Sequence, residues 1–207
     1  MKTQLLIFVL LSTFSLPVFT VDLSTPTGRV QDSIEKVIDV LKDRSLDREA
    51  RWEKVGVIID DSFDFRSMSQ SVLASNWKKA TPEERKRFVE FFSQYIEDTY
   101  RNKIEAYTDQ EVTVKGETIR GKRAIVETVI VTDTTVIPVN YKLKNNNGTW
   151  YAYDIVIEGV SLVNNYRSTF AAVVKNEGME GLMDDIQRRI RKHRQMNEGD
   201  PSGSNGS

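Results

Sequence analysis

Few residues of this chain have types and spacing that could support chemistry. Asp154 stands between Tyr153 and Ile155 in an otherwise apolar stretch, and His193 is the only histidine of the chain. A carboxylic acid beside a tyrosine can take part in proton transfer, but acid–base catalysis needs a second titratable group within reach of the substrate. No histidine, cysteine or second carboxylate accompanies Asp154 at such a spacing. The sequence therefore predicts that Asp154 is a partly buried structural acid held by hydrogen bonds, and that the chain is not an enzyme.

Composition excludes several kinds of site. The chain has 207 residues, no cysteine and one histidine, so disulfides, thiolate zinc sites, iron–sulfur clusters and histidine-pair metal sites are ruled out. Its 29 Lys and Arg against 30 Asp and Glu give a net charge of −1, whereas nucleic-acid-binding proteins are usually strongly basic. The sequence has no G-x-S-x-G, H-E-x-x-H or G-x-G-x-x-G motif. We expect no cofactor, no metal and no nucleic-acid partner.

A basic run lies near the carboxyl end, and two interpretations of it stay open. It could touch anionic lipid headgroups or an acidic partner. It could equally be a solvated helix face whose cations are favoured near the helix C-terminus. The residues of this run are Arg188, Arg189, Arg191, Lys192 and Arg194.

The first twenty residues predict export. Lys2 is followed by an almost wholly apolar stretch from Leu5 to Leu16, which Pro17 ends. An apolar stretch of this length is typical of a secretory signal peptide and is shorter than a membrane span of about 20 residues. We expect cleavage near Thr20. An exported domain without disulfides fits a bacterial periplasm, so the sequence predicts a signal peptide at 1–20, one domain at 21–196 and a disordered Gly/Ser-rich tail at 197–207.

Behind the signal peptide, the apolar spacing predicts helices, then strands, then helices. Asp47, Asp64 and Thr81 stand where side chains can cap helices, and Thr81-Pro82-Glu83-Glu84 is a capping box with proline at the first helical position. The helix that it opens carries a wide aromatic stripe to about Ile104. Two further helices are expected from Ser161 to about Val174 and from Met179 to about Met196.

Between these helical segments the apolar period changes to two. Four strands joined by short turns are predicted between Val112 and Glu158, which indicates an antiparallel sheet. Pro138 suits an edge or a bulge position. Helices followed by such a sheet indicate an α+β fold in which helices cover one face. The long strand near Val126 carries apolar residues on both faces, so the sheet could curl around an apolar cavity that holds a lipid-like ligand.

Four motifs, in this order, resemble the MlaC or toluene-tolerance family of periplasmic phospholipid carriers. They are F-D-F-x-x-M from Phe63, W-x-x-A-T-P-E-x-R from Trp77, W-x-x-Y-D-x-x-I-E-G-V-S-L from Trp150, and N-Y-R-S-T-F from Asn165. With the signal peptide, the resemblance spans nearly the whole mature chain. The departures are Ala74 and Ser75, where a glycine often follows the leucine of the first motif, and Thr169, where glutamine is common.

The resemblance implies an NTF2-like fold with an apolar cavity between a curled four-stranded sheet and the helices. It implies a carrier that shuttles phospholipid between an inner-membrane ABC transporter complex and an outer-membrane lipoprotein complex, and so maintains outer-membrane lipid asymmetry. Two other functions stay open: an exported enzyme of the same fold acting on a small apolar ligand, and an exported protein-interaction module.

The expected lipid-binding residues are apolar or aromatic positions on elements that should face one another. This expectation does not settle which face of each strand points inward. The predicted lining is Phe92, Tyr95, Tyr100, Val129, Val131, Val139, Tyr141, Val156, Tyr166 and Phe170.

Overall fold

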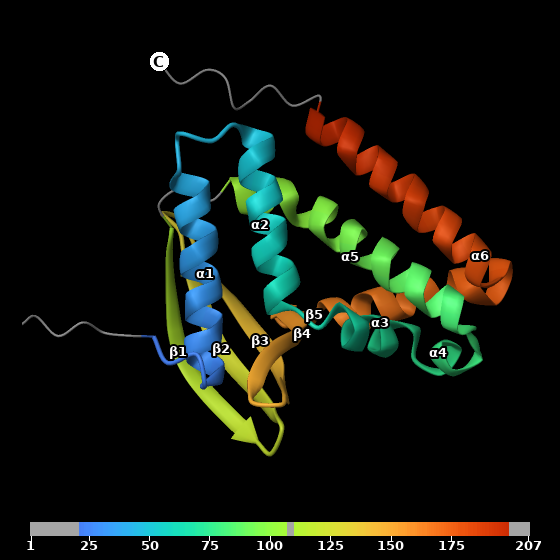
Figure 1. Ribbon diagram of the computed structural model, residues 1–207, viewed down its shortest axis with the longest axis horizontal. Coiled ribbons are helices and arrows are strands. Elements are labelled where there is room, and N and C mark those ends of the chain that lie inside the picture. Colours follow the sequence, from blue (N-terminus) through green and yellow to red (C-terminus); the bar gives the residue numbers. More distant parts are fainter. Residues whose placement is uncertain (1–20, 107–109, 199–207) are drawn as a thin grey trace, which may run out of the picture.

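The computed structural model describes residues 21–106 and 110–198. The predicted signal peptide at 1–20 and residues 199–207 of the predicted tail at 197–207 lie outside these residues, whereas Asn197 and Glu198 of that tail belong to the last helix. Six helices and five strands follow one another in the order helices, sheet, helix (Figure 1). This order confirms the α+β arrangement expected from the apolar periodicity.

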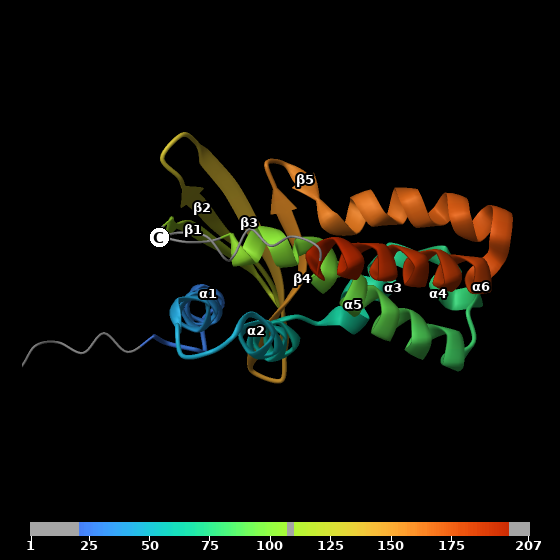
Figure 2. The same ribbon diagram turned by 90° about the horizontal axis from the view of Figure 1, so that it is seen from above.

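Two helices, α1 (Pro26–Lys42) and α2 (Arg48–Ser62), open the described chain. Thr25 caps α1 and Asp47 caps α2, each accepting a hydrogen bond from a backbone N–H three residues further on. Such caps satisfy donors that have no partner inside the helix. The two helices pack side by side over one face of the sheet (Figures 1 and 2).

Three helices follow: α3 (Phe65–Leu73), α4 (Ser75–Lys79) and α5 (Pro82–Glu105). The predicted capping box of α5 is present, because Thr81 and Glu84 each accept a hydrogen bond from the other's backbone N–H. The sequence predicts one helix from Asp64 to about Trp77, but the structure divides it into α3 and α4.

The division between α3 and α4 lies at Ala74, which has φ 50° and ψ −117°. A left-handed φ suits glycine and strains a residue with a side chain, at a cost of roughly 1–3 kcal/mol. Ala74 is one of the two residues, with Ser75, that stand where the resemblance leads us to expect a glycine. The spacing of apolar residues does not indicate such a break, so it predicts one helix that continues past Ala74.

Ala74→Gly is therefore expected to stabilise the protein. Relief of strain should exceed the extra unfolded-state entropy of glycine, which is about 0.4–1 kcal/mol. A net gain of about 1 kcal/mol corresponds to a melting temperature about 2–4 °C higher for a domain of this size. Differential scanning calorimetry checks this, with Ala172→Gly as the control, because Ala172 is exposed within a helix and its replacement should lower stability. A lower melting temperature for Ala74→Gly would contradict the prediction.

The five strands form one antiparallel sheet in sequence order. The fifth strand, which the sequence analysis did not predict, is only two residues long. Pro138 lies in the central strand β3 (Val136–Asn146), not at an edge, opposite the point where β4 (Thr149–Ile157) ends. Its missing N–H therefore removes no bond from the β3–β4 ladder. The strands are β1 (Glu111–Arg120), β2 (Arg123–Val131), β3 (Val136–Asn146), β4 (Thr149–Ile157) and β5 (Val160–Ser161).

The last helix, α6 (Leu162–Glu198), is interrupted at Gly178, which has φ 73° and ψ −171°. The two helices predicted for this region therefore exist as the two halves of α6. Gly178 turns the chain back so that the second half of α6 runs beside α5 (Figures 1 and 2). The molecule thus has a sheet covered by α1 and α2, and a helical part formed by α3 to α6.

Candidate functional site

The buried apolar residues form two separate clusters instead of one continuous core. The first cluster lies in the helical part and contains the aromatic stripe of α5 packed against α6. Phe92 lies 5.6 Å from Tyr166 and 6.1 Å from Phe170, measured between ring centroids, in edge-to-face arrangements. Phe88 stacks on Phe92 at 5.5 Å. These distances are those of tightly packed aromatic side chains, so this cluster is solid.

The second cluster lies between α1 and one end of the sheet. Val30 of α1 packs there with Val126 and Leu143 of the sheet and with Trp150. The indole N–H of Trp150 donates to the backbone carbonyl of Ser24, 3.1 Å away. A domain of this size usually has one contiguous core, whereas here half-buried apolar residues of the sheet lie between the two buried clusters.

The inner face of the sheet joins the two clusters. We call the apolar residues of this face that lie between the clusters the inner sheet surface. Register and burial place them on the same side as Val126, facing the helices. Apart from the buried Val139 they are only half-buried, although they point inward. The inner sheet surface consists of Val112, Val114, Ile130, Ile137, Val139, Tyr141, Ile155 and Ile157.

Tyr141 is a half-buried member of the inner sheet surface. Burial raises the pKa of Tyr141 to about 12. Its side chain nevertheless keeps some accessible surface, and within the described residues its hydroxyl forms no hydrogen bond. A deeply placed side chain keeps accessible surface where an internal space or narrow cleft adjoins it. The neighbouring Thr128 is fully enclosed and donates to the carbonyl oxygen of Val139 at 2.7 Å.

The structure divides the predicted lipid-binding residues among three environments. Val139 and Tyr141 belong to the inner sheet surface. Tyr100 is half-buried and packs against the first cluster. The other predicted residues lie inside the first cluster or on the outer face of the sheet. Those inside the first cluster are Phe92, Tyr95, Tyr166 and Phe170, and those on the outer face are Val129, Val131 and Val156.

The two faces of one sheet cannot line the same interior space, so the structure does not bring Val129, Val131 and Val156 together with Val139. The register shows which residues the sequence-based list omitted. Ile130 pairs with Ile137 across the two strands. This pair lies two residues further along than the pair of Thr128 and Val139, and therefore on the same face of the sheet. The alternation of side chains along β2 could have identified Ile130, because Ile130 is four residues from the fully buried Val126 and so lies on the same face.

The tyrosines between α5 and α6 are held in their neutral form. Burial, followed by the proximity of Tyr95 and Tyr100, raises the pKa of Tyr166. Burial likewise raises the pKa of Tyr100. A tyrosine that serves as a proton donor or acceptor needs a pKa near the working pH. The upward shifts therefore argue for a packing role of these side chains.

Asp154 is 3% exposed and all its hydrogen bonds hold structure together. One carboxylate oxygen accepts from the Val163 N–H at 3.1 Å; the other accepts from the Ser161 hydroxyl at 2.7 Å and from Lys142 Nζ at 2.8 Å. Val163 lies in the first turn of α6, where a carboxylate is also favoured by the helix dipole. Asp154 is therefore tied to an amide at the start of α6, whereas the nearby Arg167 donates to the Ser71 carbonyl oxygen.

His193 and the basic run lie on the second half of α6. His193 is half-buried with its ring 5.9 Å from that of Tyr95. Asp185 pairs with Arg188 and Arg189, and Asp98 pairs with Arg194. Part of the basic run is thus engaged within the protein. In the part of the chain that the structure describes, no three His, Cys, Asp or Glu side chains are grouped to hold a metal ion.

Glu97 is the titratable group with an unusual pKa in the range of physiological pH. Burial, then the nearby Asp60 and Asp98, raise the pKa of Glu97 to about 7, against a partial lowering by Arg194. The folded pKa therefore lies above the ordinary value of 4.5. Between these two values the folded state holds more protons than the unfolded state, so this group's contribution to stability falls as the pH rises.

Glu97→Gln is accordingly expected to raise the melting temperature at pH 8 and to leave it nearly unchanged at pH 4. Melting curves from pH 4 to pH 9 measure the difference between variant and parent, which should grow through pH 5 to 7. Glu53→Gln is the control, because Glu53 is exposed on α2. A constant difference across the whole range would show that Glu97 does not titrate as stated.

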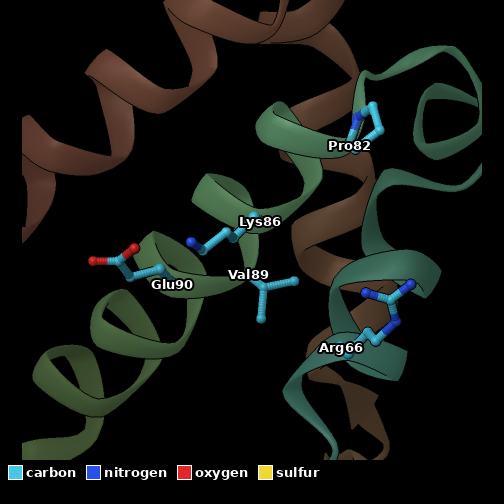
Figure 3. A pocket seen from close by; sticks show the side chains of 5 residues that line it. All are labelled: Arg66, Pro82, Lys86, Val89 and Glu90. Carbon is cyan, nitrogen blue, oxygen red and sulfur yellow. The ribbon is translucent and has the colours of Figure 1, made fainter.

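Two pockets of the described residues lie at the surface. One, of about 340 Å³, lies between α3 and α5, with Val89 and Pro82 as apolar walls and Arg66, Lys86 and Glu90 around them (Figure 3). In Figure 3 the Lys86 amine and the Arg66 guanidinium lie on opposite sides of Val89 and do not converge. The other, of about 660 Å³, is mostly polar and is lined by Phe63, Asp64, Arg66, Ser67, Gln70, Lys144, Asn146, Asn147, Thr149 and Tyr151.

Neither pocket is the apolar cavity that the sequence analysis predicts between sheet and helices. The inner sheet surface is the part of the described chain whose geometry fits that prediction. In residues 21–106 and 110–198, no helix has the length and apolar character needed to cross a membrane.

Comparison with known proteins gives consistent matches. The family model described as "MlaC protein" matches residues 31–188. The toluene tolerance protein ttg2D of Pseudomonas putida is 27% identical over 204 residues, covering 94% of each chain. The intermembrane phospholipid transport system binding protein MlaC of Haemophilus influenzae is 24% identical over 123 residues, 56% of this chain and 58% of that one. A phospholipid-binding protein from Ralstonia solanacearum, solved with a phospholipid, superposes with a TM-score of 0.74 at 22% identity, covering 80% of this chain and 97% of that one.

Proposed function

Because the chain belongs to the MlaC family, we propose that it is a periplasmic carrier that holds the acyl chains of a phospholipid against the inner sheet surface. The observation that carries this proposal is the half-buried, inward-facing apolar surface between two separate clusters. Two relatives support it, because the Ralstonia protein was solved with a phospholipid and the Haemophilus protein is named for phospholipid transport.

The free energies of transfer fit such a carrier. Each CH₂ group removed from water is worth roughly 0.8 kcal/mol, so two long acyl chains favour burial by on the order of 20 kcal/mol. A membrane offers the chains the same apolar surroundings, and the gain then nearly cancels. The protein therefore needs an apolar interior with an affinity close to that of its donor and acceptor membranes, and needs no catalytic group.

The lining that we propose keeps Tyr100, Val139 and Tyr141 from the sequence-based expectation. It adds members of the inner sheet surface that share their face: Ile130, Ile137 and Ile157. The aromatic residues of the first cluster lie next to this surface, and those that border it would be displaced as the chains enter. Val129, Val131 and Val156 are left out because they face the other way.

We further propose export through the signal peptide at 1–20, and exchange of lipid with an inner-membrane ABC transporter complex and an outer-membrane lipoprotein complex. The family membership supports this exchange. Fractionation tests the export: the chain should be found in the periplasmic fraction without residues 1–20. Retention in membranes after a salt wash, with these residues still attached, would refute it.

Organic extraction of the purified protein followed by mass spectrometry tests the carrier function. Phospholipid in an amount comparable to the protein is expected. A folded protein that yields no phospholipid, both from its native cells and after incubation with phospholipid vesicles, would refute the proposal and favour a protein-interaction module. Turnover of a small apolar compound would instead favour an enzyme.

A further inference from the structure

The outer face of β2 and β3 carries an apolar patch that is exposed to solvent. Val131 pairs with Val136, and Val129 pairs with Pro138 directly beside them. These four side chains form what we call the outer valine patch. Val131 is 38% exposed and Val136 is 55% exposed. The other face of these strands is the one that α1 covers, since Val30 of α1 packs with Val126 (Figures 1 and 2).

Four carboxylates surround the outer valine patch. Glu111 lies opposite Val131 in the β1–β2 pairing. Glu127 precedes Val129 by two residues on the same face of β2. Asp133 lies in the hairpin between β2 and β3, and the backbone N–H of Glu158 donates to the Pro138 carbonyl oxygen at 2.9 Å. All four acids are exposed.

None of these acids is neutralised by a neighbour in the described residues. Glu111 accepts one hydrogen bond, from the Thr113 hydroxyl at 3.3 Å. No ion pair of the described chain includes Glu111, Glu127, Asp133 or Glu158. Apolar residues scattered singly over a surface need no explanation, but a contiguous patch with a polar rim is the arrangement of a protein–protein interface.

The negative charge of the four acids indicates which kind of partner can bind the outer valine patch. A second copy of the chain that used the same patch would bring acids against acids, because a two-fold contact places the same residues on both sides. An anionic membrane surface would be repelled in the same way. A protein surface with an apolar centre bordered by lysine and arginine is complementary in both respects.

We propose that the outer valine patch with its four acids is a docking surface for a protein partner whose apolar contact residues are bordered by Lys and Arg. This docking surface lies on the opposite face of the sheet from the inner sheet surface. Its existence does not depend on lipid being carried inside, so the two proposals can fail separately.

Site-specific cross-linking in cells of the source organism tests the docking surface. The photoreactive residue p-benzoylphenylalanine replaces Val136 in the full chain, and mass spectrometry identifies the cross-linked peptide. We expect a protein segment that contains lysine or arginine. In the Glu127→Gln, Glu158→Gln background the yield should fall by roughly two- to thirtyfold, the loss expected when two exposed ion pairs are removed. The identified protein, once purified, should bind the parent chain more tightly than this charge-neutralised variant.

Two controls make the outcome decisive. The same photoreactive residue at Val57, which is 66% exposed on α2, should not give the same product. The lipid content of the Glu127→Gln, Glu158→Gln variant should equal that of the parent, which separates docking from cargo binding. Cross-links only to a second copy of the chain or only to lipid would overturn the proposal. So would a yield that does not change when the two acids are neutralised.

Discussion

Replacing Val139 with glutamate is expected to remove the phospholipid that copurifies with the protein. Val139 is 5% exposed on the inner sheet surface, so the new carboxylate would lie where we place the acyl chains. Burying a charged group without a partner costs several kcal/mol. Because 1.4 kcal/mol already corresponds to a tenfold change in affinity, lipid content should fall at least about tenfold. Extraction and mass spectrometry of equal amounts of folded protein measure it.

Val131→Glu is the matched control for this substitution. Valine is replaced by glutamate in both variants, but Val131 lies on the outer face and is 38% exposed. The sequence alone predicts that a charge at either position abolishes lipid binding, because it does not tell which face is inner. With the faces assigned, we expect Val131→Glu to keep its full lipid load. Equal loss in both variants would show that the assignment of the inner face does not govern lipid binding.

A second variant guards against the case in which Val139→Glu fails to fold. Val139→Phe adds apolar volume instead of charge. If a space adjoins Val139, phenylalanine should enter it, displace acyl chains and leave the melting temperature nearly unchanged. In a completely filled core the same substitution would cost about 1–3 kcal/mol. A lower melting temperature with an unchanged lipid load would therefore contradict a cavity at this place.

The sequence predicts the helices and strands of this protein better than it predicts which face of each one packs against which neighbour. Helix caps such as Asp47 and Thr81 are local signals, and the structure has both. The break at Ala74 is not local in this sense, because it depends on where α3 and α4 must pack. The same holds for the strands. Alternation divides β2 into two faces, but only the position of α1 relative to Val126 tells which face points inward.

The aromatic stripe of α5 shows a second limit of the sequence. Phe92 and Tyr95 have the spacing of an apolar helix face, which suits a cavity wall and a solid core equally well. Their neighbours decide between the two, and Phe170 and Tyr166 of α6 fill the space against them. The half-buried inner sheet surface became recognisable only when burial could be compared along paired strands.

Asp154→Ala is expected to lower the free energy of unfolding strongly. The substitution leaves the Val163 N–H without an acceptor in a buried site and removes the acceptor of the Ser161 hydroxyl. Each buried polar group left unsatisfied costs about 1–3 kcal/mol. Lys142 is partly exposed and can turn toward solvent, so its contribution is small. A total of about 3 kcal/mol corresponds to a melting temperature lower by about 6–12 °C.

Asp154→Asn and Asp184→Ala complete this test of a structural acid. Asparagine keeps one oxygen that can accept from Val163 N–H but loses the ion pair with Lys142, so its effect should be smaller than that of alanine. Asp184 is exposed on α6, and its replacement should change the melting temperature little. Lipid content per folded molecule should survive in all three variants, because Asp154 faces away from the inner sheet surface. If Asp154→Ala melts like the parent while a measurable catalytic turnover disappears, Asp154 is a catalytic acid and the carrier function is wrong.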